Sequence, residues 1–139
     1  MLILTRISGL ALGVFLTSAG SSHLGSNRKE FLAQVPTWLP LDPDFVVIAS
    51  GLVEIALGIL LITTTFIFTK FRRQVGIAVA VFFILIFPGN INQYVNQIDA
   101  FGLDTDQKRL IRLFFQPILV LWALSSTNVI RLTKKSAKG

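Results

Sequence analysis

The chain has no cysteine and one histidine, His23, among its 139 residues. The absence of cysteine excludes disulfide exchange, a thiol relay, thioether-linked haem and an iron–sulfur cluster bound by this chain. One histidine excludes a bis-histidine haem within the chain and gives too few ligands for a metal site. The sequence also lacks a glycine-rich phosphate loop, a nucleophile elbow and a paired-carboxylate arrangement of the kind used in catalysis. We therefore expect no metal, no intrinsic cofactor and no catalytic residue, and not an enzyme on its own.

Charged residues are scarce. They make up 14% of the chain, whereas 53% is hydrophobic. In a small soluble domain, roughly a quarter of the residues are charged. Twelve phenylalanines against one tyrosine and two tryptophans suit a lipid-facing surface, because phenylalanine has no polar group that needs a partner. The composition predicts a multi-pass protein of the cell membrane, with the lipid bilayer as its first partner.

Four segments are long and apolar enough to span a bilayer: residues 2–22, 45–69, 75–98 and 110–130. They predict an all-α fold, a single transmembrane domain over residues 1–139 that forms an integral membrane four-helix bundle. The first segment also resembles a signal peptide, but its apolar run continues without a helix breaker to Gly20, so we expect an uncleaved helix. Gly9, Gly13 and Gly20 lie near one face of it, where a neighbouring helix can approach closely.

The basic residues indicate the orientation. With four spans, one side carries eight of them: Arg6, Lys70, Arg72, Arg73, Arg131, Lys134, Lys135 and Lys138. The other side carries five (Arg28, Lys29, Lys108, Arg109, Arg112) and six carboxylates (Glu30, Asp42, Asp44, Asp99, Asp104, Asp106). The positive-inside rule then predicts that both termini are cytoplasmic. Residues 131–139 are expected to form a basic cytoplasmic tail near anionic lipid, and we expect no nucleic-acid binding.

Glu54 is the one charged residue in the run from Phe45 to Thr69. An ionisable group inside a membrane span is a functional-site hypothesis by default. Other polar residues fall in the same outer half of the predicted bilayer, whereas the inner half has almost none. The predicted ligand-binding residues are Glu54, Asn90, Gln93, Arg112, Gln116 and His23.

The third span accommodates polar groups at its outer end. Pro88 removes a backbone donor and Gly89 adds flexibility, so we expect a kink there. Beyond it, five amides share one face of the helix: Asn90, Asn92, Gln93, Asn96 and Gln97. Amides do not titrate, so they suit binding, hydration or hydrogen-bonded packing between helices better than acid–base chemistry.

Several polar residues have a structural interpretation as well. Glu54 could pair with Arg112 as a clamp between the second and fourth spans, or it could bind a ligand or handle a proton. His23 is either a cap at the membrane interface or a ligand-binding residue. Gln116 followed by Pro117 is typical of a helix start.

Taken together, these motifs suggest a family. The set is His23 after the first span, Val35–Pro40, Ser50–Glu54, Phe87–Asn92, and Arg112–Pro117 with Trp122 and Ala123. In order and spacing it resembles the DoxX-like membrane proteins, over about Gly9 to Leu124. The chain departs from that pattern at Leu24, where the family leads one to expect an aromatic residue.

The resemblance implies a four-helix integral membrane protein from a family of diverse functions. Its namesakes resemble membrane subunits of thiosulfate:quinone oxidoreductases, and other relatives are linked to membrane redox complexes. A distant animal relative assists the assembly of nicotinic receptors. The family motifs map onto Glu54, Asn90, Arg112 and Gln116, which the depth of the polar residues also selects.

Three functions follow as hypotheses. The first is a small non-catalytic subunit that binds a quinone or a lipid headgroup in an outer-leaflet polar pocket and serves a membrane oxidoreductase. The second is an assembly or scaffold factor whose polar cluster is structural. The third is a transporter or proton pathway, which the apolar inner half disfavours. A protein partner is expected in the first two, and the sequence leaves open the ligand, a homo-oligomer and the charge of Glu54.

Overall fold

The computed structural model describes residues 3–25, 28–99 and 102–130, and this part of the chain is all-helical. Its elements are α1 (Ile3–Leu24), α2 (Arg28–Gln34), α3 (Pro43–Phe66), the 3-10 helix η1 (Thr69–Phe71), α4 (Arg72–Val95) and α5 (Asp106–Ser126). The predicted basic cytoplasmic tail, residues 131–139, lies outside the described residues.

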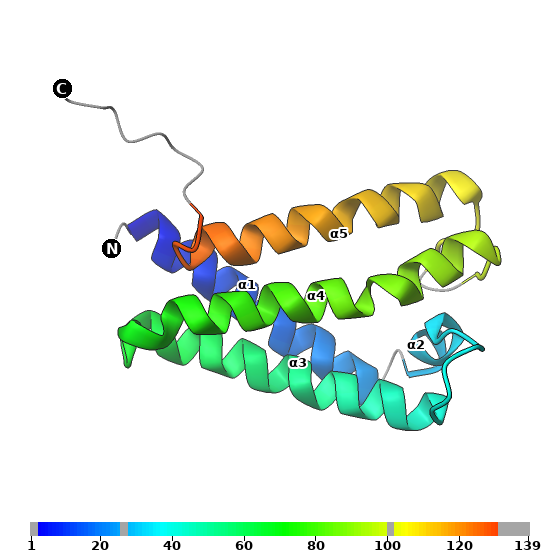
Figure 1. Cartoon of the computed structure of the whole chain (residues 1–139), viewed down its shortest axis with the longest axis horizontal. Coiled ribbons are helices and arrows are strands. Elements are labelled where there is room, and N and C mark those ends of the chain that lie inside the picture. Colours follow the sequence, from blue (N-terminus) through cyan, green and yellow to red (C-terminus); the bar gives the residue numbers. More distant parts are fainter. Residues whose placement is uncertain (1–2, 26–27, 100–101, 131–139) are drawn as a thin grey trace.

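The four long helices, α1, α3, α4 and α5, are each long and apolar enough to cross a membrane. They run side by side along the longest axis of the molecule (Figure 1). The start of α1, the turn at η1 and the end of α5 lie at one end, here called the η1 end. The short helix α2 and the connection from α4 to α5 lie at the opposite end, here called the α2 end.

The helices coincide with the four predicted spans, with shifted boundaries. Helix α3 begins at Pro43 because the Asp42 side chain accepts a hydrogen bond from the Asp44 amide and caps the helix. Helix α5 begins at Asp106 because Thr105 caps it by accepting from the Lys108 amide. Apolar content alone missed both of these charged first turns. It also missed α2, so the described residues contain five α-helices rather than four.

Glycines bring α1 and α3 into close contact. A Cβ atom added at Gly58 would lie 2.7 Å from the Gly13 carbonyl oxygen and 2.8 Å from the Thr17 amide nitrogen. One added at Gly20 would lie 2.6 Å from the Gly51 carbonyl oxygen. Real Cβ atoms do not approach a backbone so closely, and small residues are what lets membrane helices pack backbone to backbone. The predicted packing role of Gly13 and Gly20 is confirmed.

Apolar side chains fill the middle of the bundle. The fully buried members of this core are Leu12, Leu16, Leu61, Val79 and Ala123, with Phe83 only 1% exposed. They come from α1, α3, α4 and α5, so all four long helices meet here. This core separates the polar groups at the two ends of the molecule.

Buried polar groups occur at the η1 end as well. Arg72 is 2% exposed, and its Nη2 donates to the Thr5 carbonyl at 2.8 Å and to the Ser126 carbonyl. Thr65 and Thr127 are also buried at this end. The expectation that the inner half of the bilayer contains almost no polar group is therefore wrong at the η1 end. There the Arg72 side chain turns into the bundle and joins α1, α4 and α5.

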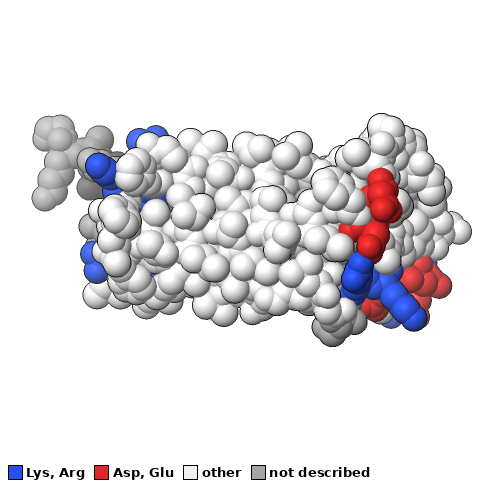
Figure 2. All heavy atoms as spheres, turned by 90° about the horizontal axis from the view of Figure 1, so that it is seen from below, with Lys and Arg blue, Asp and Glu red and all other residues white. Residues whose placement is uncertain are grey.

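The charged residues gather at the two ends, and a broad uncharged surface lies between them (Figure 2). Among the described residues, the charged side chains of the η1 end are all basic: Arg6, Lys70, Arg72 and Arg73. The α2 end carries both signs of charge. The uncharged middle is the surface that a bilayer would surround.

Candidate functional site

A cavity of about 500 Å³ lies at the α2 end, between α1, α3, α4 and α5 and next to α2. Most of its lining is apolar: Phe15, Ala19, Phe31, Val35, Pro36, Trp38, Leu39, Val46, Val47, Phe83, Leu85, Ile86, Pro88, Gly89, Leu103 and Leu119. The polar lining residues are His23, Gln34, Ser50, Glu54, Asn90 and Arg112. A concave apolar site with a few converging polar groups is the usual form of a small-molecule site.

His23 and Glu54 form the polar wall on the α1 and α3 side. His23 lies over Gly51, whose missing side chain leaves room for it, since a Cβ there would be 2.7 Å from the His23 Cβ. Its Nδ1 is 3.2 Å from Ser50 Oγ, and its Nε2 is 3.2 Å from Glu54 Oε2. The Nε2–Oε2 contact is within ion-pair distance but lacks hydrogen-bond geometry, so Oε2 is buried without a hydrogen-bond partner. His23 and Glu54 are 6% and 4% exposed.

Asn90 of α4 and Arg112 of α5 form a second polar wall of the cavity. Asn90 Nδ2 and Arg112 Nη1 both donate to Gln116 Oε1, at 3.3 and 3.2 Å. The Gln116 amide in turn donates to the Phe83 carbonyl at 2.5 Å. Gln116 thus ties α5 to α4 and holds the two lining residues in place.

Helix α2 closes the cavity next to His23. The ring of Phe31 packs against the His23 ring. Gln34 Nε2 donates to Gln93 Oε1 at 2.7 Å, and the Gln34 carbonyl accepts from Asn92 at 3.3 Å. The amide face of α4 therefore binds α2, which favours its packing interpretation for these two amides.

An ion pair outside the predicted spans also holds α2. Both nitrogens of Arg28 that face Asp44 donate to its carboxylate, with Nε–Oδ1 at 3.0 Å. The hydrogen bonds and the negative charge of Asp44 raise the pKa of Arg28 above its ordinary value. This pair joins the start of α2 to the first turn of α3.

Four of the six predicted site residues meet at the cavity: His23, Glu54, Asn90 and Arg112. Gln93 and Gln116 do not line it, and both support neighbouring groups instead. The predicted clamp between Glu54 and Arg112 is wrong, since among the described residues the ion-pair contact of Glu54 is to His23. Arg112 lines the same cavity and interacts with Glu54 only beyond ion-pair distance.

His23 lies in the last turn of α1 and is buried, with its ring on the cavity. One further structural interpretation is wrong. Gln116 and Pro117 do not start a helix, because α5 begins ten residues before Gln116, at Asp106. Ser50 and Phe31 were missed as site residues. Ser50 precedes Glu54 by four residues, the spacing of one helix face, and that signal could have found it.

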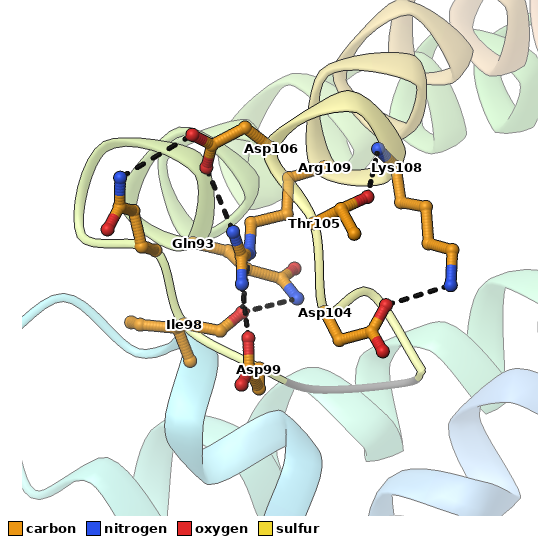
Figure 3. Close-up of polar contacts among 9 residues, drawn as sticks. Gln93, Ile98, Asp99, Asp104, Thr105, Asp106, Lys108 and Arg109 are labelled. Atoms are coloured by element: carbon orange, nitrogen blue, oxygen red, sulfur yellow. Dashed lines mark hydrogen bonds and ion pairs between the residues drawn. The ribbon is translucent and has the colours of Figure 1, made fainter.

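Arg109 organises the connection from α4 to α5 at the same end (Figure 3). It is 5% exposed and donates to Asp99, to Asp106 Oδ1 at 2.9 Å and to the Ile98 carbonyl at 3.1 Å. Nearby, Lys108 Nζ donates to Asp104 at 2.8 Å on the surface, and this bond lowers the pKa of Asp104. Sequence reasoning placed Arg109 only in a charged loop.

Comparison with models of known protein families assigns this chain to a family. The model of a family described as "Domain of unknown function (DUF8561)" matches residues 12–127. This chain belongs to the DUF8561 family. No curated protein and no solved structure matches it. The region shared with the DUF8561 family includes both polar walls of the cavity and Arg109.

Proposed function

We propose that this DUF8561 protein is a small non-catalytic subunit that binds a lipophilic ligand, a quinone or a lipid, in the cavity at the α2 end and serves a membrane oxidoreductase. The α2 end is the outer side, both termini are cytoplasmic, and the protein resides in the cell membrane. The observation that carries the proposal is the apolar cavity with His23, Glu54, Asn90 and Arg112 on its walls.

The two polar walls offer a bound headgroup different chemistry. Arg112 and Asn90 have N–H groups that can donate to a carbonyl or an anionic oxygen. On the other wall, the His23–Glu54 pair can take or give a proton at the Nε2–Oε2 contact. The apolar lining, including Phe15 and Leu119, suits the ring or chain of the ligand. The link to an oxidoreductase comes from the resemblance to the DoxX-like proteins, and electrons would come from that partner.

Filling the cavity tests the proposal. Ala19 lines the cavity, so Ala19→Phe is expected to weaken the binding of decylubiquinone and of a short-chain phospholipid by at least about tenfold, because the ring takes the ligand's space. Trp38 also lines the cavity, so quenching of its fluorescence in a Trp122→Phe background measures binding. Ala11→Phe is the matched control, since Ala11 lies on the same helix and is exposed. Equal binding by the two variants would contradict the proposal.

An assembly or scaffold role is the second candidate function. It is favoured by the number of polar groups that bind one another, as Gln116 binds Phe83 and Gln93 binds Gln34. In that case, Glu54→Gln would lower the stability of the fold or the recovery of a protein partner while ligand binding stays unchanged. If instead Glu54→Gln alters quinone binding and quinone reduction by the native complex, the subunit role is favoured.

A further inference from the structure

The charge of the cavity depends on three of its lining residues, His23, Glu54 and Arg112. No other lining residue carries an ionisable side chain. A bound headgroup has to complement the sum of these three charges, because an unbalanced charge in an apolar site is costly. The positions of the hydrogens on His23 determine that sum.

Ser50 indicates where His23 carries its ring hydrogen. The Ser50 hydroxyl lies 3.0 Å from the Val47 carbonyl, three residues earlier on α3. A serine hydroxyl has one proton, and in a helix it is commonly donated to a carbonyl three or four residues back. With that proton on Val47, Ser50 Oγ can only accept from His23. Nδ1 of His23 therefore carries a hydrogen.

The opposite nitrogen of His23 then faces Glu54. A neutral imidazole with its hydrogen on Nδ1 has a bare Nε2, and an ionised carboxylate also only accepts. Two acceptors 3.2 Å apart repel each other, and Oε2 would stay buried without a hydrogen bond. One proton between Nε2 and Oε2 removes this conflict. Whether Glu54 or His23 carries it, the charges of the pair sum to zero.

Arg112 is then the unbalanced charge of the cavity. Among the described residues, no carboxylate lies within ion-pair distance of its guanidinium. Its hydrogen bond is to the neutral amide of Gln116, and it uses one of five N–H donors. The lining thus carries one net positive charge.

We propose that the cavity takes a singly charged anionic amphiphile, whose anionic oxygens bind Arg112 while its apolar chain lies along Phe15, Leu85 and Leu119. This inference rests on the proposed function and specifies its ligand as an anion rather than a neutral quinone. A fatty-acid carboxylate and the phosphate of an anionic phospholipid both have this chemistry.

Probes with one chain length and different headgroup charge test the inference. Calorimetric titration in a non-ionic detergent compares ionised dodecanoate, neutral dodecanol and dodecyltrimethylammonium. Dodecanoate is expected to bind about 10- to 100-fold more tightly than dodecanol, the range of a charge-assisted hydrogen bond, and the cation should bind least. Arg112→Gln should reduce dodecanoate binding to the level of dodecanol. Lys108→Gln, an exposed cation at the same end, is the matched control and should change neither.

Each result separates the possibilities. Retained dodecanol binding by Arg112→Gln shows that the variant is folded. Two results would exclude an anionic ligand and leave the proposed function standing. In one, dodecanoate and dodecanol bind wild type equally; in the other, decylubiquinone binds and dodecanoate does not displace it. If no probe binds, decylubiquinone included, the anion proposal and the proposed function both fail.

Didecanoyl phosphatidylglycerol, titrated alongside, distinguishes the two kinds of anionic amphiphile. Tighter binding than dodecanoate assigns the site to a phospholipid, and weaker binding assigns it to a free fatty acid.

Discussion

Gly58→Ala is expected to destabilise the bundle by about 2 kcal/mol, although alanine is the better helix former. The reason is the close approach of α1 and α3, where the new Cβ would lie 2.4 Å from Thr17 Oγ1 and 2.7 Å from the Gly13 carbonyl oxygen. The Thr17 backbone also lies in the way, so a rotamer change alone cannot relieve the contact. The helices have to separate. Reversible unfolding in mixed micelles measures the loss.

Gly25→Ala is the matched control. Its new Cβ would meet the Ser21 carbonyl oxygen at 3.7 Å, an ordinary contact, and nothing nearer. We expect its free energy of unfolding to stay within about 0.5 kcal/mol of wild type. If Gly58→Ala were as stable as Gly25→Ala, the glycine contacts would not hold α1 against α3.

Arg109→Ala is expected to lower the free energy of unfolding by about 2 kcal/mol, the size of a lost hydrogen bond to a charged group, and the Ile98 carbonyl keeps its bond from Gln93 Nε2. Arg109 is buried, and its three acceptors come from the connection between α4 and α5 and from the first turn of α5 (Figure 3). The side chains of Asp99 and Asp106 are well exposed, so water solvates them in the variant and the loss stays moderate.

Lys108→Ala provides the comparison for Arg109→Ala. Lys108 and Asp104 form an ion pair in which both side chains are more than half exposed. Because water screens such a pair, its removal is expected to change stability much less than Arg109→Ala does. Equal losses for the two variants, measured under the same unfolding conditions, would show that Arg109 is an ordinary surface charge.

Apolar length and glycine spacing were enough to predict the four long helices and a close helix contact on the glycine face of α1, but not that the neighbour is α3. Charged first turns at Pro43 and Asp106 were missed because capping by Asp42 and Thr105 extends a helix beyond its apolar run. Helix α2 was missed because its seven residues mix polar and apolar side chains without a clear helical period. It is held by tertiary contacts, such as Gln34 with Gln93.

The site was predicted in its composition but not in its pairing. Depth along each span placed Glu54, Asn90 and Arg112 in the outer half of the bilayer, and the structure brings them to one cavity. Which of them touch depends on the rotation and order of the helices, which one sequence does not contain. The close packing of α1 on α3 brings His23 within ion-pair distance of Glu54, whereas Arg112 lines the same cavity beyond that distance.

Native mass spectrometry of the protein, purified gently from its own membrane, tests the central claim most directly. The account predicts one bound lipophilic molecule per chain, retained in Ala11→Phe and lost in Ala19→Phe and Arg112→Gln. An empty cavity in wild type, or a bound molecule that persists in both cavity variants, would contradict it.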